Sequence, residues 1–382
     1  MSENRMEDFY NPEELKHSYD RMEHGKARAD AIRSAIEAAD AHDDKSFRIF
    51  FRLEMCEESC FYGDNMDMMV IFPEALAIVD RYPDTPSTCF DNAYTDEMDH
   101  VLWVYKWVVS NCKDFYQIPM ADCLKFFEDF KRRSQAYGYN LRPYYGYLYH
   151  FYEEIDPEKA REAFYAFEKL PRDGNCDCKA CERNNSIEFW LKNGEPERAR
   201  ELAEDIEKFT LRCGHDRKAA WLRLKTHYME YHLRREEFEE AEKYCRILER
   251  QTLQDTEFQC WDRFLYCYAY LDMGKALRLY KEHWKDWLEE RDPSEIFDNS
   301  INIARFFKKL QEERETGTIK LSLDVAFPLY QESGEYRIAD LYRYYYGRAE
   351  EFAERFDRRN GTEHYHDRLV RALGDRNSEK KI

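Results

Sequence analysis

A short signature recurs along the chain and constrains the fold more than any other feature. Its copies read DPEKA, EPERA, EFEEA and DMGKA, and the alanines that end them are separated by 39, 42 and 35 residues. Each copy follows one helical pattern and opens a second amphipathic helix, because proline and acidic residues are favoured in a first turn. Repeats of this length with two antiparallel helices stack into an α-solenoid. The four alanines, and the alanine of a more divergent copy in FPEALAIVDRYP, are Ala160, Ala199, Ala241, Ala276 and Ala75.

One copy has the form of a known repeat family. The stretch NNSIEFWLKNGEPERARELAEDIEKF, with Gly194 at the inter-helix turn and Ala199 early in the second helix, resembles the tetratricopeptide repeat. The resemblance extends over about residues 40–290. It implies a right-handed superhelix of antiparallel helical hairpins, and a chain that binds proteins or peptides, as most members of that family do.

The chain is also similar to a narrower group of bacterial tetratricopeptide-like proteins that have no assigned activity. The residues that carry this resemblance are DCKACE (Asp177 to Glu182), Cys213, and FDRRNGTEHYHDRL (Phe356 to Leu369). The resemblance implies a bacterial origin and an architecture, and it implies no activity.

We therefore expect an all-α chain with three parts. Residues 1–41 form capping helices from about Pro12 to Ala41, residues 42–290 form the repeats, and residues 291–382 form a C-terminal helical cap. Residues Pro83 to Glu97 are rich in Pro, Thr, Asp and Asn, which predicts a long loop. Alternating apolar residues predict a short strand or hairpin within Thr318 to Tyr336. A last helix, Ile338 to Arg359, is then expected to end at Asn360-Gly361, because glycine can take the left-handed conformation that stops a helix.

The charge balance excludes some classes of partner. The chain has 78 acidic and 59 basic residues and a formal net charge of −19, whereas binding to nucleic-acid phosphates needs clustered Lys and Arg. The most apolar short run, Met66 to Phe72, still contains Asp67 and is far shorter than a membrane span. The N-terminus has no signal pattern. We expect a cytoplasmic protein that binds neither nucleic acid nor membranes.

Cysteines gather in one segment. The stretch RDGNCDCKACERNN contains Cys176, Cys178 and Cys181, and Cys213-Gly214-His215 follows 32 residues after Cys181. If residues 183–193 and 196–210 form an antiparallel hairpin of two similar helices, its open ends meet and bring these residues together. Two or three thiolates with an imidazole make a common structural zinc site. The predicted ligands are Cys178, Cys181, Cys213 and His215, with Cys176 as the alternative fourth ligand.

Two other interpretations of the cysteines stay open. The first is that they are reduced thiols without a metal, since nine other cysteines are scattered along the chain and free Cys is an ordinary buried residue. The second is that they form a redox or catalytic centre, although the βαβ setting of a thioredoxin-like CxxC is missing.

The rest of the sequence favours binding over catalysis. Standard nucleotide-binding, metalloprotease and hydrolase motifs are absent. Runs of tyrosine cover every side of a helix, which suits either a recognition surface or the filling of gaps between irregular repeats. We expect a non-enzymatic scaffold that binds a protein or peptide in a groove lined by Tyr144, Tyr147, Tyr345 and Arg348. The alternatives are a signal-peptide-responsive regulator that acts through a protein partner, and a zinc- or thiol-dependent enzyme.

Overall fold

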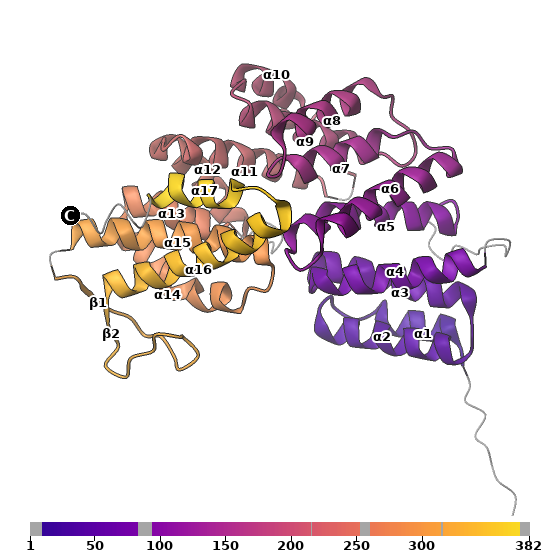
Figure 1. The fold of residues 1–382 in the computed structure, drawn as a ribbon, viewed down its shortest axis with the longest axis horizontal. Helices are drawn as coiled ribbons and strands as arrows, with labels where there is room; N and C mark the ends of the chain where they lie inside the picture. The colour runs from indigo at the N-terminus through magenta and orange to yellow at the C-terminus, as the bar shows by residue number, and fades with distance from the viewer. Residues whose placement is uncertain (1–9, 83–93, 215, 253–259, 315, 375–382) are drawn as a thin grey trace, which may run out of the picture. The chain divides into compact units, whose positions relative to one another are not determined.

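A computed structural model describes residues 10–82, 94–214, 216–252, 260–314 and 316–374. The described residues form seventeen α-helices, one short 3₁₀ helix and two short strands (Figure 1). The chain divides into two compact units, Met1–Cys176 and Asp177–Ile382, which we call unit 1 and unit 2.

Unit 1 contains eight α-helices among its described residues, and its core is built from their apolar faces. They are α1 (Pro12–Tyr19), α2 (Lys26–Ala41), α3 (Lys45–Tyr62), α4 (Asn65–Arg81), α5 (Glu97–Asn111), α6 (Met120–Tyr137), α7 (Arg142–Tyr152) and α8 (Pro157–Lys169), with the 3₁₀ helix η1 (Cys112–Asp114) after α5. The helices expected between Pro12 and Ala41 are therefore α1 and α2. Most of the loop predicted from Pro83 to Glu97 lies outside the described residues, and α5 begins at Glu97.

Unit 2 contains the other nine α-helices and both strands. They are α9 (Lys179–Lys192), α10 (Pro196–Glu207), α11 (Ala219–Arg234), α12 (Phe238–Thr252), α13 (Trp261–Leu271), α14 (Met273–Glu289), α15 (Pro293–Glu313), β1 (Thr318–Lys320), β2 (Glu335–Arg337), α16 (Ile338–Asn360) and α17 (His364–Leu373).

Helices that follow one another in the chain pack as pairs. The pairs with the most extensive contacts include α3 with α4, α7 with α8, α9 with α10, α11 with α12, α13 with α14 and α15 with α16. The first helices of successive pairs also contact one another, as α3, α5 and α7 in unit 1 and as α9, α11, α13 and α15 in unit 2. The prediction of sequential helical hairpins is confirmed.

The recurring signature has one structural role in its four closer copies, whereas the divergent copy ending at Ala75 lies in the middle of α4 and does not open a helix. Ala160, Ala199, Ala241 and Ala276 are all buried, and each backbone N–H donates to the carbonyl of the residue four positions earlier, closing the first turn of its helix. In two copies the signature also supplies the N-cap, because the carboxylates of Asp156 and Asp272 accept backbone N–H groups of that turn. A methyl group at these positions lets the second helix of the pair approach the first closely.

The C-terminal part agrees with the sequence in two respects and departs from it in one. β1 and β2 form an antiparallel pair in which Ile319 is opposite Tyr336, so the predicted hairpin insertion is confirmed. α16 ends at Asn360, and Gly361 follows with a left-handed φ of 68°. The expectation that α16 is the last helix is wrong, because α17 follows it. Tyr365, Leu369 and Leu373 recur at four-residue spacing and are buried, which gives α17 its apolar face.

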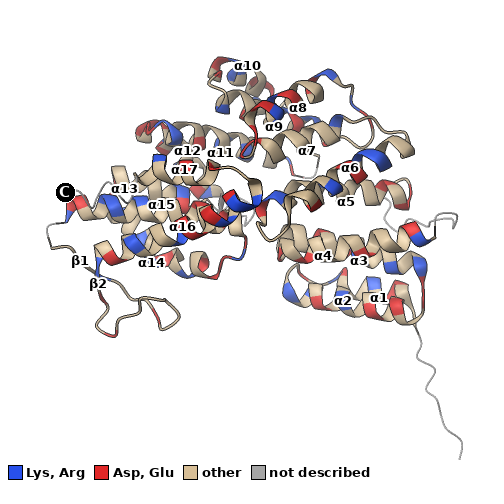
Figure 2. Cartoon of the chain, viewed as in Figure 1, with Lys and Arg blue, Asp and Glu red and all other residues tan. Residues whose placement is uncertain are grey.

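Acidic and basic side chains are interspersed along the helices of both units (Figure 2). Many of them form pairs at helical spacing, such as Lys16 with Asp20 and Arg246 with Glu242. None of the described helices combines the length and apolar character that crossing a lipid bilayer requires.

Candidate metal centre

Three cysteines from two segments of unit 2 converge on one point. The Sγ atoms of Cys178, Cys181 and Cys213 all lie within 4.8 Å of one another, and those of Cys181 and Cys213 are 3.9 Å apart. Ligand sulfurs about 2.3 Å from a tetrahedral zinc ion are about 3.8 Å apart. The cluster therefore has nearly the spacing of three zinc ligands, and it could hold a metal ion.

The first two sulfurs are positioned by the start of α9. Cys178 is the N-cap of this helix, with extended backbone angles, and its Sγ accepts the backbone N–H of Cys181 at 3.4 Å. The sequence predicted a helix only from residue 183, so Cys181 lies inside the first turn rather than ahead of it. This placement fixes the two side chains by helical geometry and puts both sulfurs where the helix dipole favours negative charge.

The third sulfur is positioned by a sharp turn after α10. Phe209 takes a left-handed φ of 55°, and the N–H groups of Thr210 and Leu211 both donate to the carbonyl of Asp205. The ring of Phe209 stacks on Trp221 of α11, with centroids 5.8 Å apart. These contacts terminate the helix and direct the chain, with Cys213, back toward the start of α9.

A buried asparagine ties the elements around the cluster together. Asn184 of α9 is fully buried, and its Nδ2 donates to the carbonyl of Ala220 in α11 at 2.9 Å and to that of Ala180 at 3.3 Å. On the neighbouring face, Arg183 donates to the carbonyl of Leu202 in α10. The three helices that surround the sulfurs are thus joined by polar contacts as well as by packing.

The pKa values of the Cys178 and Cys181 thiols are shifted in opposite directions. A hydrogen bond from the Cys181 thiol lowers the pKa of Cys178, and the N–H groups of Cys181 and Ala180 lower it further against the opposing effect of burial. The same hydrogen bond, followed by burial, raises the pKa of Cys181. A thiolate is the form that binds metal, so the cluster is prepared to hold negative charge at Cys178.

The structure does not place either candidate for the fourth ligand, His215 or Cys176, in the cluster of three sulfurs. His215 lies outside the described residues. Cys176 is not one of the three clustered sulfurs: it is the last residue of unit 1, and its Sγ accepts the N–H of Asp173 at 3.3 Å and lies 3.6 Å from the Asp173 carboxylate.

The four residues predicted to line a groove lie in both units. Tyr144 and Tyr147 are in α7 of unit 1, where Tyr144 is buried against Phe127 and Tyr147 is half-buried. Tyr345 and Arg348 are in α16 of unit 2. Tyr345 is 1% exposed, and its hydroxyl lies 3.1 Å from that of Tyr280, so this side chain belongs to the core. Arg348 is half-buried and donates to the carbonyl of Trp287.

Sequence reasoning missed the residues that support the cluster. Asn184 looks like any polar residue of a helix, and only its burial between α9 and α11 reveals its role. Phe209 takes the left-handed conformation although it is neither glycine nor asparagine, the residue types that usually mark such a turn in a sequence. No protein-family model matches the sequence, and none of the curated proteins matches it.

Proposed function

We propose that unit 2 binds one zinc ion through Cys178, Cys181, Cys213 and His215, and that the ion is structural. The observation that carries this proposal is the clustering of the three sulfurs within 4.8 Å. Four protein ligands would fill the tetrahedral shell and leave no position for water or substrate, which is the arrangement of structural rather than catalytic zinc.

The zinc ion would join the first turn of α9 to the segment that leaves α10. Without the ion, three partly buried thiol groups share the site, and that of Cys178 favours the thiolate form. A divalent cation would neutralise that charge and hold both ends of the α9–α10 hairpin. Metal binding of this kind contributes directly to folding free energy.

We further propose that the whole chain is a non-enzymatic, tetratricopeptide-like scaffold of the bacterial cytoplasm that binds a protein or peptide. The serial contacts of α9, α11, α13 and α15 support a stack of hairpins, and a right-handed superhelix is the form we propose for it. Aromatic side chains also remain exposed on the helices, among them Tyr165 and Tyr270, each 43% exposed. Exposed tyrosine is enriched in recognition surfaces.

The zinc proposal is tested by elemental mass spectrometry on protein purified without chelators. We expect about one zinc per chain in the wild type and much less in Cys181→Ser. Cys60→Ser is the matched control, because Cys60 is a part-buried thiol of α3 in unit 1, and this variant should keep its zinc. A wild-type chain without zinc would overturn the proposal.

The binding role is tested separately by selecting peptides from a displayed random library on the purified chain. The expected result is a related set of peptides that bind saturably when synthesised. Failure to enrich any sequence, with the protein folded and zinc-loaded, would contradict a peptide-binding role and leave the zinc site unaffected.

A further inference from the structure

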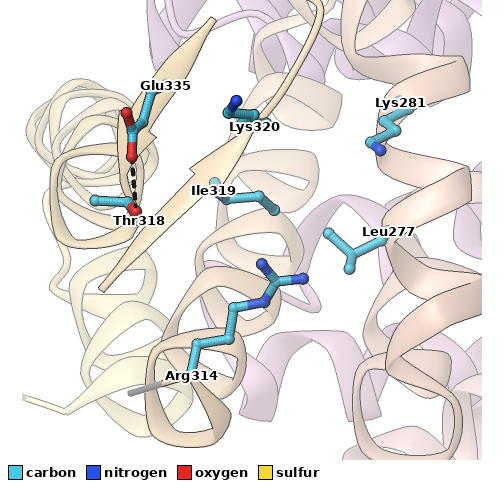
Figure 3. A pocket seen from close by; sticks show the side chains of 7 residues that line it. All are labelled: Leu277, Lys281, Arg314, Thr318, Ile319, Lys320 and Glu335. Atoms are coloured by element: carbon cyan, nitrogen blue, oxygen red, sulfur yellow. Dashed lines mark hydrogen bonds between the residues drawn. The ribbon is translucent and has the colours of Figure 1, made fainter. Parts of the chain in front are cut away.

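Basic side chains from separate parts of unit 2 surround one pocket (Figure 3). The pocket has a volume of about 310 Å³ and lies between α14, the residue that follows α15, and the β1–β2 hairpin. Its lining residues are Leu277, Lys281, Arg314, Thr318, Ile319, Lys320 and Glu335.

The cations of this pocket lack the acidic partners that are common elsewhere in the chain. Lys281, Arg314 and Lys320 are exposed, and within the described part of the chain their side chains form no ion pair or hydrogen bond. By contrast, Arg343 of α16 pairs with Asp340 at 2.8 Å. The one carboxylate among the described lining residues, that of Glu335, accepts a hydrogen bond from Thr318 at 3.1 Å. The lining therefore has an excess of positive charge on a chain whose net charge is −19.

The pocket also has an apolar side. Ile319 is 5% exposed and Leu277 is half-buried, and Figure 3 shows the guanidinium of Arg314 beside the space that these two side chains border. The lining thus offers positive charge and aliphatic surface together. An inorganic anion would use only the charge, whereas an organic acid could bury its hydrocarbon part on Leu277 and Ile319.

We propose that this pocket binds a carboxylate attached to a short apolar group. Arg314 would hold the carboxylate through two parallel hydrogen bonds, the geometry in which guanidinium and carboxylate groups fit best. Lys281 and Lys320 would add charge from α14 and β1, and Leu277 with Ile319 would cover the apolar group. Such a ligand is either the free C-terminus of a peptide that ends in an aliphatic residue or a small aliphatic acid.

The two sources are separated by titration calorimetry with four probes. They are the peptide acetyl-Gly-Ser-Gly-Ser-Leu with a free C-terminus, the same peptide as its C-terminal amide, 4-methylpentanoate, and inorganic phosphate. Binding of the free peptide in preference to 4-methylpentanoate identifies a peptide terminus, and the reverse order identifies a small acid. In both cases the amide and phosphate should bind at least about tenfold more weakly.

The residues are tested with Arg314→Gln and Lys281→Met, which remove one charge each. Both should weaken binding of the preferred carboxylate, by about tenfold or more for Arg314→Gln. Arg343→Gln removes the same charge from α16 outside the pocket and should leave binding unchanged. The proposal is overturned if neither carboxylate binds at millimolar concentration, if phosphate binds as tightly, or if Arg343→Gln weakens binding as much. Because all three side chains are exposed, the variants should keep the wild-type melting temperature. Neither result for carboxylate binding changes the expected zinc content of the chain.

Discussion

The sulfur of Cys181 lies 3.9 Å from that of Cys213, although 32 residues separate them in the chain. The α9–α10 hairpin accounts for this proximity, because it returns the chain to the level of its starting point.

Cobalt substitution should report the ligand set directly. We expect Co²⁺ to replace zinc and to give the intense visible absorption of a tetrahedral ion together with sulfur-to-cobalt charge transfer in the near ultraviolet. The charge-transfer band should fall by about one third in Cys213→Ser, because one of three sulfur ligands is lost. A pale, octahedral spectrum in the wild type would contradict the proposed coordination.

Asn184→Leu should weaken zinc binding, although Asn184 is not one of the proposed zinc ligands. The substitution removes the hydrogen bond that ties α9 to the carbonyl of Ala220, at a cost of about 1 kcal/mol in the free energy of unfolding. We expect zinc affinity, measured by competition with a chelating dye, to fall by about tenfold, because Asn184 also bonds to Ala180, which lies between the ligands Cys178 and Cys181. Asn193→Ala is the control, because the side chain of Asn193 donates to the carbonyl of Phe189 in its own helix. Equal affinity in all three proteins would show that Asn184 does not position the site.

His227 should make unit 2 sensitive to acid. This histidine of α11 is 8% exposed, and its Nε2 has no hydrogen-bond partner among the described residues. Burial lowers its pKa below 6.5; Arg223 and Lys192 lower it further, whereas Glu188 and Glu230 oppose the shift. As the pH drops below about 6.5, His227 is protonated more readily in the unfolded chain than in the folded chain. The free energy of unfolding therefore falls in this pH range.

The measurement is urea unfolding at pH 7.5 and pH 5.5. His227→Phe should lose less stability between these pH values than the wild type does, because the buried group no longer titrates. His366→Gln, at an exposed position of α17, should behave as the wild type. An unchanged pH dependence in His227→Phe would mean that other groups account for the acid sensitivity.

Ala199→Leu tests the close approach of the two helices in a pair. Ala199 is fully buried where α10 packs on α9, so a larger side chain must push the helices apart. The expected loss is about 1 to 3 kcal/mol in the free energy of unfolding. The same change at the neighbouring exposed position, Arg200→Leu, should alter stability by less than about 0.5 kcal/mol. Similar effects in both variants would count against a packing role for the signature alanine.

The sequence predicted the parts of the molecule that depend on local spacing. The alanines of the signature predicted the second helix of four pairs, α8, α10, α12 and α14, because proline or an acidic residue at a helix start and a small residue one turn later are local features. The meeting of Cys178, Cys181 and Cys213 was predictable for a related reason: two successive helices of similar length must bring their outer ends together.

The parts that the sequence did not reveal depend on distant packing. Tyr345 was expected on a groove, but α16 contacts α15, α17 and β2, so it is covered on more sides than a helix of a simple hairpin. Consecutive tyrosines hide such a difference, because they place an aromatic ring on every side of the helix. The pocket around Arg314 could not be found either, since Lys281 lies 33 residues before Arg314 and shares no sequence pattern with Arg314 or Lys320.

The position of Cys178, one residue after the start of unit 2, has a practical consequence for dividing the chain. A fragment that begins at Asp177 retains all three clustered sulfurs, whereas one that begins at the second turn of α9 retains only Cys213. Limited proteolysis should therefore distinguish the two states of the metal: an occupied centre would protect the bonds just after Cys178, and an empty one would leave the first residues of unit 2 open to cleavage.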